Sequence, residues 1–385
     1  MDDRTTRSQG DLIVTVVFVA MLLVPGMLAL AGYARSDTAF IGSREARRPF
    51  VAPPPTSGAL ATGGWERDAE REIADAFPLR TQLIESYDHA KYDWLHDVGS
   101  SLVMPGRDGW LFLAADEFDE LTGRFHPSDA DLARVADRYA ARSSWCARHG
   151  IRYVFVLAPN KSTVYPDELP PGITPVTPTP ADRLYAMLAA RHVASVDVRA
   201  RLRDLARANP QTERGMLYSY GDTHWNDAGA YAAYRTLVEV LTSSGVHDTI
   251  RPETIDAHVV IAGGDLLRLA GVSANVGNRW LRYDFPRRAR DIAPPDPPPG
   301  DPAYTTFVPT ASERDDPALP SVVVFGDSFT EQLHRFLAES FRRSLFLRVP
   351  QPTDPQFDER VLLAQKPTVV IDEMVERNLV YSVRL

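Results

Sequence analysis

The sequence predicts an α/β protein with a doubly wound, mostly parallel sheet flanked by helices and preceded by one transmembrane helix. Strands alternate with helices from residue 128 to the carboxyl end, which is typical of this architecture. The expected strands are near-continuous apolar runs, as in strands that are buried on both faces. With 385 residues, 44% of them hydrophobic, the chain can form one large domain or two smaller ones.

An uncharged run near the amino terminus predicts the membrane segment. Residues 12–32 read LIVTVVFVAMLLVPGMLALAG, and at about 1.5 Å per residue such a helix spans a bilayer core of about 30 Å. The alternative is a cleaved signal peptide, whose apolar core would be shorter, about 7–15 residues. We therefore expect a cytoplasmic tail over residues 1–11 and a single-pass anchor over residues 12–32 in the cell membrane.

Charge constrains the topology and the partners. Arginines lie on both sides of the apolar run, which leaves the charge argument for orientation open, but long domains cross membranes largely regardless of charge. We expect the remainder to be extracytoplasmic. The net charge is −9 and no basic patch dominates, which disfavours a nucleic-acid partner. Cys146 is the only cysteine, so no intrachain disulfide can form, and its helical pattern indicates a buried apolar position.

The segment after the anchor predicts a spacer and then the folded domain. Residues 33–64 contain RRPFVAPPPTSGALATGG, whose prolines and small residues are typical of an extended linker. The domain is expected over residues 65–385. It begins with a helical pattern from Trp65 to about His96, followed by a tight turn at Asp108-Gly109 that leads into a short apolar strand.

Helix signals and apolar runs then alternate. Ser128 with Asp131 forms a capping-box pattern at the start of a helix that ends at Gly150. Thr179 precedes a proline and begins a helix that reaches about His192. Buried strands are predicted at IRYVFVLAP, ASVDV, SVVVFGDSF, SLFLRV and PTVVIDEM.

Ser328 is the candidate nucleophile. It lies in VVVFGDSFTEQL, where four apolar residues end in Gly-Asp-Ser and a helix follows. This context predicts a hydroxyl at the carboxyl end of a strand, where open α/β sheets bind ligands. The following helix amino terminus favours developing negative charge, and Gly326 permits a tight turn.

Asp222 and His224, in GDTHWN, are the candidate base and its orienting partner. A serine needs a base within hydrogen-bond reach, and the base needs a group that holds it. Residues two apart point the same way in an extended or turn backbone and not in a helix. The motif is therefore expected just before the helix that follows, with Asn226 or Asp227 as its cap.

Other interpretations of these motifs stay open from the residues alone. Gly-Asp-Ser is also common turn chemistry, and Asp-Thr-His can be a surface turn or part of a metal site. A zinc site needs three or four ligands, and the remaining histidines show no paired ligand spacing, so no metal is expected. We expect the Ser328 hydroxyl and a ring nitrogen of His224 to lie within about 4 Å of each other.

Together these motifs resemble a known family. GDTHWN and GDSF, with the upstream blocks GRDGWLF and LAPNKSTVYPDELP, resemble the alginate O-acetyltransferase group of the AlgJ and AlgX type, which have extracytoplasmic SGNH hydrolase-like domains with a flavodoxin-like sheet. GGDLLRLAG and the tail VVIDEMVERNL also match blocks of this group. The resemblance covers roughly residues 65–385. The order Asp, His, Ser favours this branch, because ordinary SGNH esterases have the serine block first.

The resemblance implies roles for particular residues. Asp222, His224 and Ser328 would form the catalytic triad, and the second oxyanion donor stays open. Asn160, Lys161 and Tyr165 are candidates for lining the site, with a solvated loop charge as the alternative for Lys161. Trp225 would either pack under the imidazole or face a sugar.

The resemblance also implies a function. The expected protein is a membrane-anchored O-acetyltransferase that forms an acetyl-serine and acetylates hydroxyls of an exported polysaccharide. A membrane-bound O-acyltransferase would supply the acetyl groups, and no cofactor is expected. Two alternatives remain: a carbohydrate acetylesterase with the same triad, and a non-catalytic glycan-binding or assembly protein. The polysaccharide does not follow from these residues.

Overall fold

The computed structural model describes residues 3–33, 36–45, 47–95, 97–115, 117–208, 216–272, 277–295, 308–348 and 357–384. The chain divides into two compact units. The first unit holds residues 1–100 with 268–275, and the second holds residues 101–267 with 276–385.

The first unit is helical. Among the described residues, one helix is long and apolar enough to cross a membrane, the 24 residues Gly10–Tyr33, in which a stretch of 18 residues has a mean hydropathy of 2.7. Helices of this kind near an amino terminus occur in anchors and in signal sequences alike. The expected linker contains helical turns as well as extended chain. The helices of this unit are α1 (Asp3–Leu28), α2 (Thr38–Glu45), α3 (Ser57–Ala61), α4 (Gly64–Asp75) and α5 (Arg80–Leu95), with a π-helical turn at Ala29–Tyr33.

The helical pattern from Trp65 to about His96 forms two helices, α4 and α5, and not one. Pro78 explains the break, because the residue before a proline avoids the helical conformation. His96 lies outside the described residues. Arg47, in the expected linker, donates to both carboxylate oxygens of Asp75 at 2.7 Å, which ties the extended chain to the end of α4.

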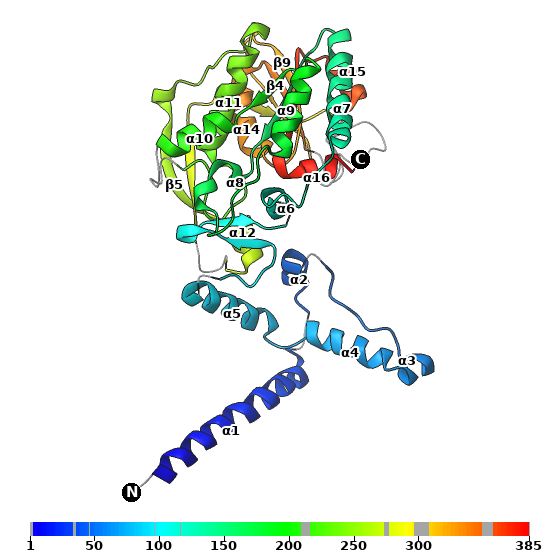
Figure 1. The fold of residues 1–385 in the computed structure, drawn as a ribbon, viewed down its shortest axis with the longest axis vertical. Coiled ribbons are helices and arrows are strands. Elements are labelled where there is room, and N and C mark those ends of the chain that lie inside the picture. The colour runs from blue at the N-terminus through cyan, green and yellow to red at the C-terminus, as the bar shows by residue number, and fades with distance from the viewer. Residues whose placement is uncertain are drawn as a thin grey trace. The chain divides into compact units, whose positions relative to one another are not determined.

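The second unit is built on a seven-stranded sheet (Figure 1). Its strands, in spatial order, are β4 (Ser195–Asp197), β3 (Arg152–Ala158), β11 (Val369–Val375), β9 (Ser321–Gly326), β10 (Arg343–Arg348), β8 (Thr310–Glu313) and β7 (Arg290–Ile292). The first five strands are parallel, whereas β8 is antiparallel to both β10 and β7. The carboxyl ends of the five parallel strands therefore meet at one edge.

The prediction of a mostly parallel sheet is corrected to a mixed sheet. The two antiparallel strands read TASE and RDI, which are too short and too polar to resemble buried strands. Two small antiparallel sheets are also present, β1 (Val103–Pro105) with β2 (Leu111–Leu113), and β5 (Asp256–Ala262) with β6 (Asn278–Asp284). The predicted strands at IRYVFVLAP, ASVDV, SVVVFGDSF, SLFLRV and PTVVIDEM are confirmed over the bounds given, although Val349 of SLFLRV lies outside the described residues.

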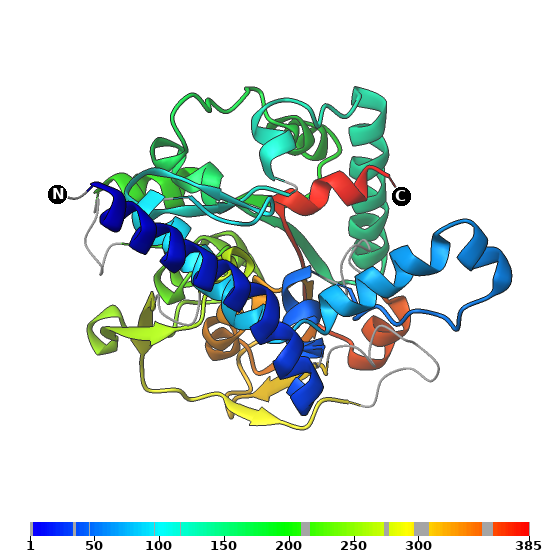
Figure 2. The ribbon, with the colours of Figure 1, turned by 90° about the horizontal axis from the view of Figure 1, so that it is seen from below.

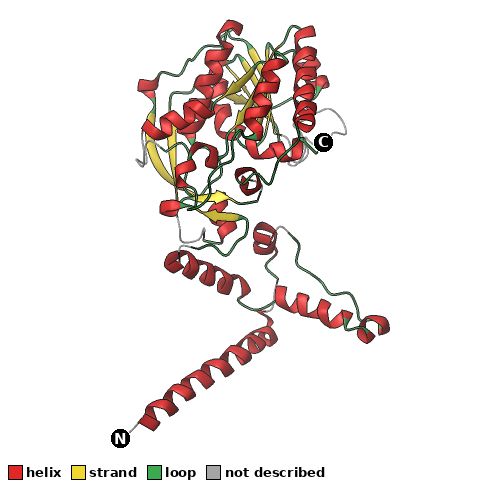
Figure 3. Cartoon of the chain, in the orientation of Figure 1, coloured by secondary structure: helices red, strands yellow, loops and turns green. Residues whose placement is uncertain are grey.

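Helices cover both faces of the sheet, as the colouring by element type in Figure 3 makes clear. Among the described residues, the α-helices after residue 100 are α6 (Glu117–Leu121), α7 (Asp129–Arg148), α8 (Lys161–Val164), α9 (Pro180–Ala190), α10 (Arg199–Ala208), α11 (Asp227–Leu241), α12 (Asp265–Ala270), α14 (Thr330–Leu337), α15 (Glu359–Gln365) and α16 (Leu379–Ser382). Along β9, Val322 and Val324 belong to a core with α10, α11 and α14, and Val323 and Phe325 belong to a second core with α7, α9 and α15.

Local signals set several helix ends. Ser128 and Asp131 form the predicted capping box of α7, and Thr179 forms a second one at α9. Cys146 is buried, as predicted. The short helix α16 lies beside α7 (Figures 1 and 2). The side chain of Arg138, on α7, donates to the carbonyl of Ser382 at the end of α16.

Candidate active site

Ser328 lies in the turn between β9 and α14, at the carboxyl edge of the sheet. The turn is tight, since a Cβ on Gly326 would lie 2.3 Å from Cγ2 of Thr330. The buried carboxylate of Asp327 fixes it: one oxygen accepts from the N–H of Phe329 at 3.0 Å, and the other accepts from the N–H of Val375 at 2.7 Å. The serine is partly exposed and is held on a turn that is tied to the end of the neighbouring strand β11.

His224 connects this serine to Asp222. Its Nε2 lies 2.8 Å from Oγ of Ser328, and its Nδ1 lies 2.8 Å from Oδ1 of Asp222. The first distance is within the limit of about 4 Å expected from the sequence. If Nδ1 carries the proton and donates it to Asp222, the lone pair of Nε2 faces the serine hydroxyl. This arrangement can accept the hydroxyl proton when the serine attacks an electrophile.

Asp222 is ionised at neutral pH. Burial raises the pKa of its carboxyl, but hydrogen bonds from the ring and backbone N–H of His224 and from the N–H of Asp265 outweigh it, and the net shift is downward. The backbone N–H of His224 donates to Oδ1 at 2.8 Å, and that of Asp265 donates to Oδ2 at 3.1 Å. These backbone bonds hold the carboxylate beside the ring of His224.

Asp265 is a site residue to which the sequence argument gave no role. Its carboxylate accepts from the N–H of Thr223 at 2.8 Å and from the Thr223 hydroxyl at 2.5 Å, and it lies 3.6 Å from Nδ1 of His224. It therefore supports the segment between Asp222 and His224. The available signal was its place in the GGDLLRLAG block.

Close packing of Gly264 against Gly221 explains why the GGDLLRLAG block has a glycine at this position. The carbonyl of Gly221 accepts from the N–H groups of Leu266 and Leu267 at 3.1 and 3.2 Å. A Cβ on Gly264 would lie 2.2 Å from that carbonyl oxygen, so no larger residue fits without moving backbone. The start of α12 is thereby fastened to the loop of Asp222.

Lys161 is buried against the same loop, so its side chain is not available to a substrate. It is 1% exposed, and its Nζ donates to the carbonyls of Ser219, Tyr220 and Asp222 at 3.1, 2.9 and 2.8 Å. Burial lowers the pKa of Lys161 to about 8, although the carboxylate of Asp222 acts in the opposite direction. The expected substrate-lining role is corrected to a role in holding the loop, because three carbonyls occupy the ammonium.

Trp225 is likewise a core residue. It is 0% exposed, its Nε1 donates to the carbonyl of Phe329 at 3.0 Å, and the two rings are 5.1 Å apart at an edge-to-face angle. The ring is covered, so it does not face a sugar, and it packs against Phe329, whose ring centre lies 5.0 Å from that of the His224 imidazole. The other interpretation, packing directly under the imidazole, stays a prediction. Asn226 caps α11 by accepting from the N–H groups of Ala228 and Gly229.

The other two predicted lining residues also have backbone partners. The hydroxyl of Tyr165 accepts from the N–H of Leu217 at 2.8 Å, just before the Asp222 loop. Asn160 is buried, and its carboxamide oxygen accepts from the N–H of Arg377 at 3.3 Å. The guanidinium of Arg377 lies over the ring of Phe329, 5.3 Å from its centre. Asn160 also borders a separate pocket, described below.

A metal is a possible use of this cluster, because one ligand atom each from Asp222, His224 and Asp265 lie within 4.8 Å of one another. The hydrogen bonds argue against it. Both oxygens of Asp222 and both of Asp265 already accept donors, and Nδ1 of His224 is at hydrogen-bond distance from Asp222. Three ligand atoms also fall short of the four that a closed structural zinc site uses.

Comparisons with known proteins identify a family and a fold. A family model described as an SGNH hydrolase-like domain, acetyltransferase AlgX, matches residues 103–376. Bacillus cereus PatB1 with a sulfonyl adduct is similar in structure at 14% identity and a TM-score of 0.52, covering 74% of this chain and 98% of that chain. This likeness shows a shared fold.

Two further solved structures are similar at lower TM-scores. The O-acetyltransferase domain of Pseudomonas putida AlgJ is 20% identical with a TM-score of 0.47, covering 72% of this chain and 92% of that one. Pseudomonas aeruginosa AlgX is 17% identical with a TM-score of 0.45, covering 73% of this chain and 67% of that one. Among curated protein sequences, none matches this chain.

Proposed function

Because the chain belongs to the family of SGNH hydrolase-like acetyltransferase domains of the AlgX type, we propose that it is an O-acetyltransferase that works through an acetyl-serine at Ser328. The observation that carries the proposal is the position of His224, 2.8 Å from both the serine hydroxyl and the Asp222 carboxylate. The nucleophile, the base and the group that orients the base are then hydrogen-bonded in series, as acyl transfer through serine requires.

The first half of the reaction acetylates the serine. Oγ of Ser328 attacks the acetyl carbonyl while Nε2 of His224 takes the hydroxyl proton. The imidazolium passes that proton to the leaving group as the donor's ester bond breaks, which leaves acetyl-Ser328. Asp222 holds the Nδ1–H tautomer and stabilises the transient positive charge on the ring.

The second half transfers the acetyl group. A sugar hydroxyl loses its proton to Nε2 of His224 and attacks the acetyl-serine carbonyl; the serine oxygen then leaves and recovers the proton. The N–H of Ser328 donates to no acceptor among the described residues and is our candidate for one oxyanion donor. No step uses a cofactor.

The cellular setting is part of the proposal. The apolar helix Gly10–Tyr33 supports a single-pass anchor, with residues 1–11 cytoplasmic, 12–32 in the membrane, 33–64 as linker and the catalytic domain within 65–385 outside the cytoplasm. A membrane-bound O-acyltransferase would supply acetyl groups there, because coenzyme A is not available. The acceptor would be an exported polysaccharide. The names of AlgJ and AlgX describe those proteins, and alginate itself is not part of this proposal.

The test uses the full chain in detergent with an activated acetyl ester and a panel of oligosaccharides. The proposal expects acetylated oligosaccharide from the wild type and none from Ser328→Ala. Release of acetate without transfer to any acceptor would identify an acetylesterase. Unchanged acetylation of the cell's polymer by Ser328→Ala, with loss of acetylation when the gene is deleted, would identify a non-catalytic assembly protein.

A further inference from the structure

Glu373 is a buried acid in a row of apolar side chains on β11. Side chains alternate along this strand, and Val369, Ile371 and Val375 belong to the core that also contains Val324 of β9. Glu373 lies between the last two of these on the same face and is 0% exposed. A charge at such a place is costly unless a partner compensates it or a proton neutralises it.

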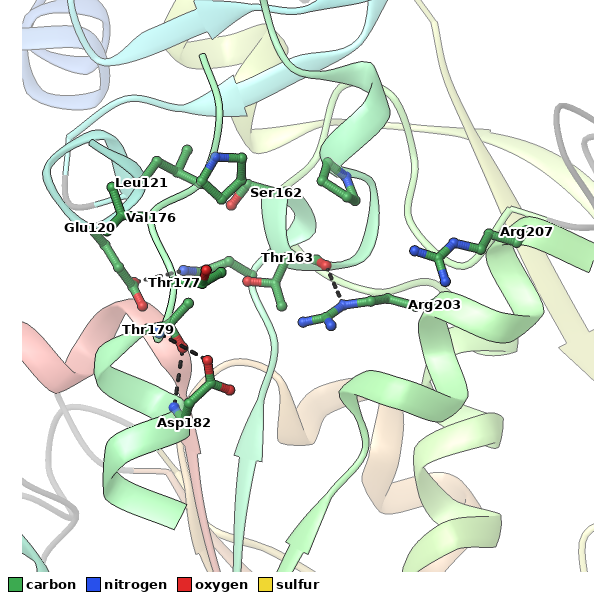
Figure 4. A pocket seen from close by; sticks show the side chains of 13 residues that line it. Glu120, Leu121, Ser162, Thr163, Val176, Thr177, Thr179, Asp182, Arg203 and Arg207 are labelled. Atoms are coloured by element: carbon green, nitrogen blue, oxygen red, sulfur yellow. Dashed lines mark hydrogen bonds between the residues drawn. The ribbon is translucent and has the colours of Figure 1, made fainter. Parts of the chain in front are cut away.

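Glu376, just beyond the end of the same strand, has such partners. Its Oε2 accepts from the N–H of Asn160 at 3.0 Å and from the hydroxyl of Thr163 at 2.5 Å, and Arg199 lies 3.7 Å from its Oε1. Burial raises the pKa of Glu376, and the charges of Arg199 and Arg203 oppose that rise. Figure 4 shows Arg203 extending toward Thr163, where both residues border, with Asn160, a cavity of about 300 Å³.

Glu373 has no cation of this kind. It forms no ion pair with any residue that the structure describes. Its Oε2 accepts from the N–H of Asp327 at 3.0 Å, and in the described part of the chain no donor reaches Oε1. Gly326 permits this approach, because a Cβ there would lie 2.7 Å from Oε2. The carboxyl is therefore held against the turn that carries Ser328.

Glu373 and Asp327 form a pair of buried acids, and the proton of the pair belongs on Glu373. The Asp327 carboxylate already accepts the N–H groups of Phe329 and Val375. The side-chain amide of Asn378 is a third donor to it, at 2.9 Å. Burial raises the pKa of Glu373 well above its usual value; the charge of Asp327 and a hydrogen bond between the two carboxyl groups add to this rise, and the backbone N–H of Asp327 opposes it. Glu373 is therefore a neutral carboxylic acid at neutral pH.

The two acids fix the backbone on both sides of Ser328. Glu373 occupies the N–H of Asp327, and Asp327 occupies the N–H of Phe329. The N–H of Ser328, between them, donates to no acceptor among the described residues and is left for the oxyanion of acyl transfer. A neutral acid beside this turn adds no negative charge that would repel the oxyanion, whereas an ionised one would.

We propose that Glu373 is a positioning residue of the active site: as a neutral carboxylic acid it holds the N–H of Asp327, which keeps the Ser328 hydroxyl beside His224 and the Ser328 N–H free for the oxyanion. Glu373 is covered and touches no substrate, so it acts only through the turn. The part that concerns the oxyanion of acetyl transfer rests on the proposed function. The placement of the hydroxyl does not.

The test compares Glu373→Gln with Glu373→Met in the full-length protein in detergent. Modification of Ser328 by phenylmethanesulfonyl fluoride, followed by mass spectrometry, reports the placement of the hydroxyl without any acetyl donor. Glutamine has the size of glutamic acid and can make the same two bonds: its carbonyl oxygen accepts the N–H of Asp327, and its amide donates to the Asp327 carboxylate. We therefore expect Glu373→Gln to be modified at a rate within about threefold of the wild type.

Methionine keeps the volume of the side chain and removes both bonds. Glu373→Met should lose about 10²-fold in the rate of Ser328 modification and in kcat for an activated acetyl ester, with KM within about twofold of the wild type. Glu373→Leu is a second apolar variant, to be used if Glu373→Met does not fold.

Glu339→Gln is the matched control, because Glu339 is also a buried acid that holds backbone. It is 2% exposed, and its two oxygens accept from the N–H groups of Arg288 and Ala289 at 2.9 and 3.1 Å. An amide in its place loses one of these acceptors. The urea midpoint of Glu339→Gln should therefore fall, while Ser328 is modified at the wild-type rate.

The outcomes separate positioning from stability and from the reaction. A loss in Glu373→Gln as large as that in the apolar variant overturns the proposal, because Glu373 would then act as a charged carboxylate. Modification of the apolar variant at the wild-type rate, or an equal loss in Glu339→Gln, also overturns it. The expected order of modification rates, without acetyl transfer to any sugar by the wild type, would leave the positioning role standing and reject the proposed function.

Discussion

Replacing Lys161 with methionine tests whether a buried ammonium holds the loop of Asp222 and His224. Methionine keeps the length and most of the volume of the side chain and removes the charge and its three hydrogen bonds. The carbonyl of Tyr220 keeps the N–H of Leu111 at 3.0 Å as a donor, and that of Ser219 keeps a weak bond from the N–H of Asp222 at 3.4 Å. The carbonyl of Asp222 keeps no donor among the described residues.

The magnitude follows from these carbonyls. A buried carbonyl left without a donor costs about 1–3 kcal/mol, so one orphaned and one weakly bonded carbonyl should cost about 2–4 kcal/mol of unfolding free energy. A shift of about 1 Å in Asp222 would also misalign His224 and lower kcat by about 10²-fold. KM for a small acetyl ester should change little, since Lys161 does not face the substrate side.

The assay combines denaturant unfolding with hydrolysis of an activated acetyl ester. Lys366→Met is the matched control, because this exposed lysine bonds only through its backbone among the described residues. A Lys161→Met protein with unfolding free energy within about 0.5 kcal/mol of wild type and unchanged kcat would refute the reasoning. A raised KM with an unfolding free energy equal to that of the wild type would show that Lys161 contacts the substrate.

Three further outcomes follow from the same loop. Activity should fall above pH about 8, where Lys161 loses its proton and can donate only two hydrogens to three carbonyls. The contribution of Lys161 to the free energy of unfolding should nevertheless rise between pH about 8 and 10.5, because over that range the unfolded chain binds more protons than the folded one. A kcat profile and unfolding curves over this pH range check both signs. Gly264→Ala should abolish ester hydrolysis, because its Cβ would meet the Gly221 carbonyl at 2.2 Å; activity near wild type would show that the loop can move. Trp225→Phe should lower kcat and cost about 1–2 kcal/mol by removing the bond to the carbonyl of Phe329, with acceptor KM unchanged; a raised acceptor KM alone would mean that the ring contacts the sugar.

Much of the scaffold was predictable because its signals are local. The apolar runs of β3, β9 and β11, the capping box of Ser128 and the cap at Asn226 each depend on a few neighbouring residues. The antiparallel strands β7 and β8 were not predictable from periodicity. They are three and four residues long, and the pairing of β8 with β10 and of β7 with β8 comes from tertiary contacts.

The candidate site was likewise predictable only in part. The meeting of Ser328 with His224 followed from strand–turn–helix context and from the spacing of Asp222 and His224. The burial of Lys161 and Trp225 did not, because a charged residue in a loop and an indole beside a histidine are also common on binding surfaces. Asp265 supports Thr223 from another segment, and that contact exists only once the chain has folded.

The most direct test of the central claim is mass spectrometry of the full-length protein after incubation with an activated acetyl ester. The account predicts one acetyl group on the peptide that contains Ser328, formed by the wild type and absent from Ser328→Ala and His224→Ala. An adduct on another residue, or acetylation of Ser328 at the same rate in His224→Ala, would contradict it.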